Sequence, residues 1–274
     1  MSDPIIGMQQ WFETPPGQYL LAWERSEFER AVVDIFGYHA LQLGLPEIDA
    51  LQANRMPHKW LGVSAAPAEE LPGATRAAPA DDVASRPSLV TDFAALPFAE
   101  NSLDLVVLPH SLELNHDPHA TLREVERVLV PEGRVVICCL NPASLWGLKQ
   151  RRAHLYRSLG IGELYLPDGG EFIGHWRLRD WLRLLNFEVE SASFGCYRPA
   201  MRSQQWLDRY GWMDKVGERW WPIFGAAYFL VAVKRVRGIK LIGKAWRPST
   251  GIATAPVPLA NRTHRAPANE KELS

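Results

Sequence analysis

Two histidines stand three residues apart around an Asp-Pro pair, in the segment His116-Asp117-Pro118-His119. Imidazoles at this spacing can share a metal ion. No cysteine or further histidine lies at a matching spacing, however, and Asp followed by Pro is typical of a helix start, where the carboxylate accepts hydrogen bonds from the first turn. We therefore interpret the segment as a helix cap and expect no metal site.

The adjacent cysteines Cys138 and Cys139 are the next residues whose side chains could be reactive. Neighbours in a strand point to opposite faces, so the two thiols should be separate core residues rather than a reactive pair. Three cysteines cannot form a disulfide framework and suit a reducing compartment. The chain also lacks a Gly-x-Ser-x-Gly elbow, a Walker loop and a dinucleotide Gly-x-Gly-x-x-Gly motif, which argues against hydrolases, ATPases and dehydrogenases.

Asp92 and His110 follow two short apolar runs, residues 88–91 and 103–108, that are typical of buried strands. Open α/β sheets bind ligands beyond the carboxyl ends of their strands. Both side chains are therefore candidates for a ligand site. The alternatives are that Asp92 caps the following turn and that His110 is a structural, hydrogen-bonded histidine.

The elements that position these residues alternate between strand and helix. Helical spacing is clear from Tyr19 to Val32, after Pro118 and from Leu178 to Leu185, whereas residues 65–87 indicate a loop. We predict strands over residues 31–36, 58–63, 88–91, 103–108, 134–140, 187–194 and 226–235. The alternation favours an open, doubly wound sheet.

Two stretches of the chain resemble a known family. The first begins at Leu89 and reads LVTDFAALPFAENSLDLVVLPHSLELNHDP, and the second begins at Leu122 and reads LREVERVLVPEGRVVI. They resemble the class I S-adenosylmethionine-dependent methyltransferases of the type 11 group. The segment from Leu178 to Val189 resembles a helix and strand of the same family more weakly. The resemblance implies a Rossmann-like, doubly wound, mainly parallel seven-stranded sheet of the α/β class, and it implies S-adenosyl-L-methionine as the cofactor.

The resemblance also implies cofactor-binding residues at the strand ends. In the family, an Asp at the position of Asp92 accepts a hydrogen bond from the adenine amino group, with an apolar neighbour against the ring. The implied set is Asp34, Gly37, Ser64, Asp92, Phe93, Pro109 and His110. This chain departs from the family after the acid Asp34, because Phe36, Tyr38 and Ala40 stand where three alternating glycines are usual. Ser64 likewise stands where the family has an acid that binds the ribose hydroxyls. A serine hydroxyl can still form a hydrogen bond to the ribose, but the bond lacks the contribution of the carboxylate charge.

We expect residues 141–176 to form a lid that contains the acceptor contacts, or else a surface loop with packed aromatic residues. If the acceptor must lose a proton, His110 is the first candidate for the general base, and His175 and Tyr156 follow.

The chain divides by composition into an acidic methyltransferase-like domain, residues 1–236, and a basic tail, residues 237–274, with seven basic and two acidic residues. We expect the tail to be disordered. Residues 200–222 are rich in tryptophan, which suits an apolar ligand site, a partner groove, a membrane interface or the packing of a final helical layer. The whole chain of 274 residues carries a formal charge of −1 and no apolar run long enough to span a bilayer.

These observations predict a cytoplasmic enzyme that transfers a methyl group to a small or lipid-like acceptor. Its expected partners are that acceptor and, through the tryptophan-rich part, a membrane surface or another protein; nucleic acid is not expected. The alternative is a non-catalytic, methyltransferase-like binding protein that has lost the cofactor through its altered first loop.

Overall fold

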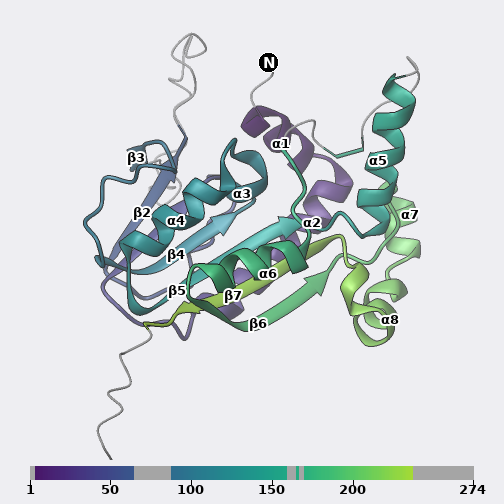
Figure 1. Ribbon diagram of the computed structural model, residues 1–274. Helices are drawn as coiled ribbons and strands as arrows, with labels where there is room; N and C mark the ends of the chain where they lie inside the picture. The colour runs from purple at the N-terminus through teal and green to yellow at the C-terminus, as the bar shows by residue number, and fades with distance from the viewer. Residues whose placement is uncertain (1–3, 65–87, 159–164, 167–169, 237–274) are drawn as a thin grey trace, which may run out of the picture. The chain divides into compact units, whose positions relative to one another are not determined.

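The computed structural model describes residues 4–64, 88–158, 165–166 and 170–236 (Figure 1). The expected loop over residues 65–87 and the expected tail over residues 237–274 lie outside these residues. Among the residues that the structure describes, no helix is long and apolar enough to cross a membrane.

A seven-stranded sheet in the order β3-β2-β1-β4-β5-β7-β6 forms the centre of the fold. Its strands are β1 (His39–Leu43), β2 (His58–Val63), β3 (Leu89–Val90), β4 (Leu103–Pro109), β5 (Leu129–Leu140), β6 (Phe187–Gly195) and β7 (Ala227–Lys234). Only β7 runs antiparallel to its neighbours β5 and β6. The predicted doubly wound, mainly parallel sheet is therefore confirmed, as a mixed sheet with one reversed strand.

Two N-terminal helices, α1 (Pro4–Phe12) and α2 (Pro15–Val32), cover one face of the sheet (Figure 1). Thr14 caps α2, because its hydroxyl accepts a hydrogen bond from the Gly17 amide at 3.3 Å. Leu20, Phe28 and Val32 are buried against this face of the sheet. Burial of this apolar stripe is the main source of the stability of α2.

The predicted strand over residues 31–36 is wrong. Helix α2 continues to Val32, and the first strand of the sheet is β1, which begins seven residues later at His39. The Asn54 amide binds the carbonyl oxygens of Val32 at 2.8 Å and Ile35 at 3.0 Å, which fixes the turn between helix and strand. The helical apolar stripe through Val32 outweighs the β propensity of the run Ala-Val-Val.

Helices α4 (Pro118–Val128) and α6 (His175–Leu184) cover the opposite face (Figure 1). The predicted cap of α4 is confirmed, because Asp117 Oδ1 accepts a hydrogen bond from the Ala120 amide at 2.9 Å. Cys138 belongs to the core under α2 and Cys139 to the core under α4 and α6, as the alternation along β5 predicts.

Four short elements complete the carboxyl edge of the sheet and its surroundings. They are α3 (Ser111–Leu114), α7 (Gln204–Arg209), α8 (Trp212–Trp220) and the 3-10 helix η2 (Pro222–Phe224). The segment predicted as a lid contains α5 (Leu145–Ser158) and the start of α6. The connection from β1 to β2, residues 44–57, has no helix, so loops rather than a helix surround the end of β1.

Candidate active site

Gly44 makes the turn that leaves β1 at the carboxyl edge of the sheet. Its φ of +109° lies in a region that side-chain-bearing residues rarely adopt, and a Cβ atom there would lie 2.5 Å from Ser111 Oγ. Ser111, which follows the end of β4, donates a hydrogen bond to the Leu43 carbonyl. The ends of β1 and β4 therefore approach closely at a position that only glycine can occupy.

Gln42 holds the loop that follows this turn. Its buried amide nitrogen donates to the carbonyls of Leu45 at 2.9 Å and Ile48 at 2.5 Å, and its oxygen accepts from the Ala50 amide at 3.0 Å. The polar residue inside β1 is thus an amide rather than an acid. After Gly44, the next two alternating positions of the loop are Pro46 and Ile48 instead of glycines.

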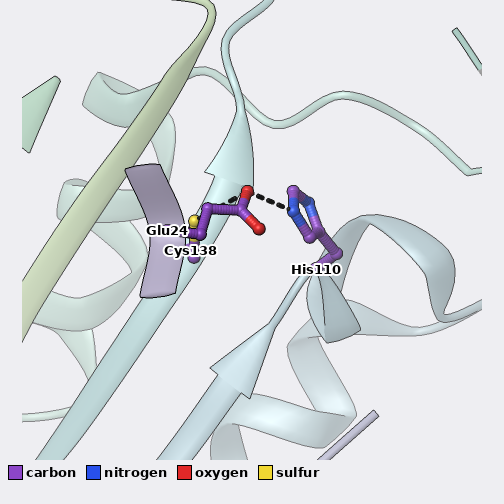
Figure 2. A group of neighbouring side chains, drawn as sticks. All are labelled: Glu24, His110 and Cys138. Carbon is purple, nitrogen blue, oxygen red and sulfur yellow. Dashed lines mark hydrogen bonds and ion pairs between the residues drawn. The ribbon is translucent and has the colours of Figure 1, made fainter. Parts of the chain in front are cut away.

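His110 connects two buried glutamates just beyond the end of β4. Its Nε2 lies 2.7 Å from Glu24 Oε1, and its Nδ1 makes a short hydrogen bond to Glu113. Glu113 in turn accepts the Leu140 amide at 2.9 Å, at the end of β5. Figure 2 shows the Glu24 carboxylate reaching between the Cys138 thiol and the His110 ring. All four side chains are buried, so α2, β4 and β5 share one polar network.

The two glutamates keep His110 protonated. Burial by itself disfavours the imidazolium, but the charges of Glu24 and Glu113 and their hydrogen bonds outweigh it and raise the pKa of His110 to about 10. Both ring nitrogens then donate to carboxylates, and no lone pair is left to accept a proton from a substrate. The structure therefore argues against His110 as the general base and in favour of a positioning role.

Glu24, His110 and Cys138 each offer a ligand atom, and these atoms lie within 4.8 Å of one another. The three ligand types are ones that zinc accepts. The hydrogen bonds account for the same arrangement, since the Cys138 thiol approaches Glu24 Oε1 at 3.5 Å and burial raises the pKa of that thiol. The absence of a resident metal stays a prediction.

Glu24 Oε2 has no hydrogen-bond partner, although it is buried. Two carboxylates and one imidazolium leave one net negative charge inside the protein at this edge. An unpaired buried oxygen of this kind is costly unless a donor or cation reaches it. The network is therefore electrostatically suited to a nearby cation.

Asp34 and Gly37 lie at the other edge of the sheet, in the turn that precedes β1. A Cβ atom on Gly37 would lie 2.5 Å from the Asp104 side chain, and Asp104 accepts the amides of Tyr38 and His39 at 2.8 and 2.9 Å. The prediction that Asp34 and Gly37 contact the cofactor followed from the misplaced strand, and the structure places both residues at the edge opposite to Gly44.

Asp92 and Ser64 lie at the ends of β3 and β2, on the same edge as Gly44. Asp92 Oδ1 accepts the Ala94 amide at 2.9 Å, as the turn-capping alternative predicts, while the side chain stays exposed. Phe93 is buried in the core under α4 rather than open to a ligand. Pro109 ends β4 and is buried.

His175 begins α6 and is partly buried among aromatic rings. Its ring centroid lies 5.0 Å from that of Phe194 and 6.2 Å from that of Tyr228. Burial and then the charge of Arg179 lower the pKa of His175, so its imidazole is neutral at pH 7. Tyr156 lies on α5 with 47% of its surface exposed.

The residues that sequence reasoning missed are Glu24, Gln42, Gly44 and Glu113. Two local signals were available. The helical spacing runs unbroken from Tyr19 to Val32, and the mainly apolar segment His39 to Leu43 ends directly at a glycine. No local signal marks Glu24, whose partner His110 is 86 residues away.

Comparisons with known proteins identify the family to which the chain belongs. A family model described as a methyltransferase domain matches residues 52–137. The uncharacterized protein YafS of Escherichia coli K12 is 32% identical over 192 residues, which is 69% of each chain. A demethylmenaquinone methyltransferase of Corynebacterium efficiens is 45% identical over 51 residues, or 19% of this chain and 22% of that protein.

Among solved structures, a possible histamine N-methyltransferase of Thermotoga maritima, described as S-adenosylmethionine-dependent, superposes with a TM-score of 0.53. The two share 14% identity, and the match covers 83% of this chain and 94% of that one. At this identity the likeness shows the fold alone. Together with the family model and the relatives, it establishes that the chain belongs to the class I methyltransferases of the type 11 group.

S-adenosylmethionine is the cofactor that this membership implies. The residues at the carboxyl edge fit such a ligand, because the cofactor is a cation and the buried network holds an unpartnered Glu24 oxygen. Gly44 also keeps the first turn of β1 in a glycine-only conformation. The fit is incomplete at the two loop positions occupied by Pro46 and Ile48.

Proposed function

We propose that this protein is an active methyltransferase that transfers the methyl group of S-adenosylmethionine to a small or lipid-like acceptor. The observation that carries the proposal is the net negative Glu24–His110–Glu113 network beside the Gly44 turn. A structural ion pair alone would not require a second carboxylate with an unpartnered buried oxygen.

When bound, S-adenosylmethionine supplies a methyl group on a sulfonium, which is already an activated electrophile. The work of the protein is then positioning and exclusion of water. Asp92 offers Oδ2 to a donor on the adenine, and the loop held by Gln42 shapes the opposite side of the site. Glu24 and Glu113 provide negative charge near the cationic part of the cofactor.

We propose His175 as the general base for an acceptor that must lose a proton. Its lowered pKa leaves a free lone pair at neutral pH, and it lies on α6 near the end of β5 and the start of β7. Tyr156 is the weaker candidate because it is exposed on α5. The lid role of residues 141–176 is part of the same proposal.

The tryptophan-rich segment is proposed as a peripheral contact with a membrane or another protein. Trp206, Trp212 and Trp220 are each about half exposed or more, and Ile223 and Phe224 follow them in the exposed run that leads into β7. The Asn141 amide binds the carbonyl of Ile223 at 2.7 Å, so this run lies beside the end of β5. An apolar acceptor would reach the site across this surface.

The proposal is tested first by calorimetric titration with S-adenosylhomocysteine. Micromolar binding supports it, and no binding at millimolar ligand supports the alternative of a methyltransferase-like protein without the cofactor. Asp92→Ala should weaken binding about tenfold through one lost charge-assisted hydrogen bond. The matched control is Glu100→Ala, an exposed acid in a neighbouring turn, which should leave affinity unchanged.

The reaction is tested with methyl-labelled cofactor. Label that enters the organic-soluble fraction of a small-molecule extract indicates a lipid-like acceptor, and label in the aqueous fraction indicates a polar one. Tight cofactor binding without transfer to either fraction would contradict the proposed activity.

A further inference from the structure

Helix α5 exposes apolar side chains where a surface helix normally exposes polar ones. Leu145 is 48% exposed, Leu148 is 49% exposed and Leu155 is 65% exposed. Their spacings of three and seven residues place them on one side of the helix. Arg152 is on the same side, between Leu148 and Leu155.

The charge of α5 has a single sign. Its sequence, LWGLKQRRAHLYRS, holds four Lys or Arg residues and no Asp or Glu. Arg151 and Arg152 are exposed, and no carboxylate of the described residues pairs with either guanidinium. Lys149, in contrast, has a partner within the protein, because its ammonium donates a hydrogen bond to the Ala200 carbonyl at 2.5 Å. Two exposed guanidinium groups therefore lie on the helix that carries the exposed leucines.

The inner side of α5 is fixed to the protein independently of the exposed side. Trp146 is buried, its ring lies 5.9 Å from that of Trp11, and its indole nitrogen donates to the Arg198 carbonyl at 2.8 Å. The Gln150 oxygen accepts the amides of Tyr165 and Leu166 at 3.0 and 2.9 Å. The exposed leucines are not needed for these contacts, so their substitution should not unfold the helix.

The position of α5 relates this surface to the candidate site. The helix begins five residues after the end of β5, at the edge that carries Gly44 and His110 (Figure 1). The bond from Trp146 to Arg198 ties it to the segment that leads into α7 and α8, where Trp206, Trp212 and Trp220 are exposed.

We propose that α5 binds an anionic lipid surface, with the side carrying Leu145, Leu148 and Leu155 in the interface and Arg151 and Arg152 at the headgroups. A membrane interface is the partner that offers negative charge and an apolar layer side by side. Nucleic acid would satisfy the arginines alone and leave the leucines in water. The inference names the partner of the peripheral contact proposed above, but it does not depend on methyl transfer.

The test uses the full chain and two vesicle compositions, phosphatidylcholine alone and phosphatidylcholine with 30% phosphatidylglycerol, in a co-sedimentation assay. The wild-type protein should bind the anionic vesicles and lose binding as salt rises. Arg151→Glu with Arg152→Glu should weaken binding about tenfold or more. Leu148→Ser should weaken binding to anionic vesicles at every salt concentration, because the lost apolar contact is not screened.

Matched controls come from the opposite face of the sheet. Arg123→Glu with Arg183→Glu makes the same change in net charge on α4 and α6, and Leu184→Ser removes an exposed leucine from α6. The inference is overturned if these controls lose as much binding as the α5 variants. It is equally overturned if the wild-type protein binds single-stranded RNA and not the vesicles.

Titration of the same preparations with S-adenosylhomocysteine separates the two proposals. Vesicle binding without cofactor binding would leave the α5 surface in place and remove the proposed enzyme. Cofactor binding without vesicle binding would support the proposed enzyme and overturn the membrane contact of α5.

Discussion

His110 Nε2 and Glu24 Oε1 lie 2.7 Å apart inside the protein, although 86 residues separate them in the sequence. This contact joins the helix that covers one face of the sheet to the end of β4. Glu113 contacts the other nitrogen of the imidazole and accepts a hydrogen bond from the Leu140 amide at the end of β5. The edge of the sheet that would hold the cofactor is thus fixed by a buried ion pair rather than by apolar packing alone.

His110→Ala should lower the free energy of unfolding by about 3–5 kcal/mol at pH 6.5, because it leaves buried carboxylates without their counter-charge. The pKa of His110 is raised in the folded state, so its stabilisation is fully present below the unfolded pKa of about 6.5. It is then lost as the pH rises toward about 10.

Urea denaturation followed by circular dichroism, at pH 6.5 and pH 9.5, measures this effect. The difference between wild type and His110→Ala should shrink at the higher pH. The control His116→Ala removes an exposed imidazole and should change stability by less than about 0.5 kcal/mol. An equal difference at both pH values would contradict a charged His110.

Gly44→Ala should destabilise the fold by roughly 1–3 kcal/mol, since it forces a side chain into a positive-φ conformation. The added Cβ would also push against Ser111 Oγ and disturb the ends of β1 and β4. Affinity for S-adenosylhomocysteine should fall with it. Gly174→Ala is the control, because its nearest neighbour would be an ordinary contact at 3.8 Å and its φ is −68°.

Gln42→Glu introduces an acid into β1 and should destabilise the protein. The new carboxylate would still accept the Ala50 amide, but it would face the carbonyl oxygens of Leu45 and Ile48 without a proton to donate. We expect a loss of at least about 3 kcal/mol in the free energy of unfolding. Gln52→Glu, an exposed change in the same connection, should be nearly neutral in thermal unfolding; a stable Gln42→Glu protein would refute this account of the loop.

His175→Gln should lower kcat by about 10²–10⁴-fold with an acceptor that must be deprotonated. Because burial and Arg179 lower the pKa of His175 from its ordinary value, the wild-type rate should be flat at neutral pH. It should fall only at more acidic pH than an ordinary histidine would give, as the imidazole becomes protonated. The variant should lose that acidic limb of the pH profile. His116→Gln should retain it, and an unchanged profile in His175→Gln would remove this histidine from the mechanism.

The sequence by itself determined the class of fold and most of its elements. Local signals were sufficient wherever one residue acts on its neighbours in the chain, as in the Asp117 cap of α4, the alternation of Cys138 and Cys139 and the apolar run of β4. The family resemblance along residues 89–137 lies in the same kind of segment, where each strand and helix is specified by its own pattern. Its cofactor assignment rests on the family and not on the geometry of the loops.

Only the tertiary structure decided where the first strand lies and what surrounds its end. The run Ala31-Val32-Val33 has the composition of a strand, but Val32 is buried on the face of α2 that packs against the sheet and stays helical. The first strand therefore ends at Gly44 instead of leading into Gly37. His110 looked like a base from its position at a strand end. Its protonation depends on Glu24, a residue that only folding brings near, because a buried charge is set by the groups around it in space and not by those beside it in the chain.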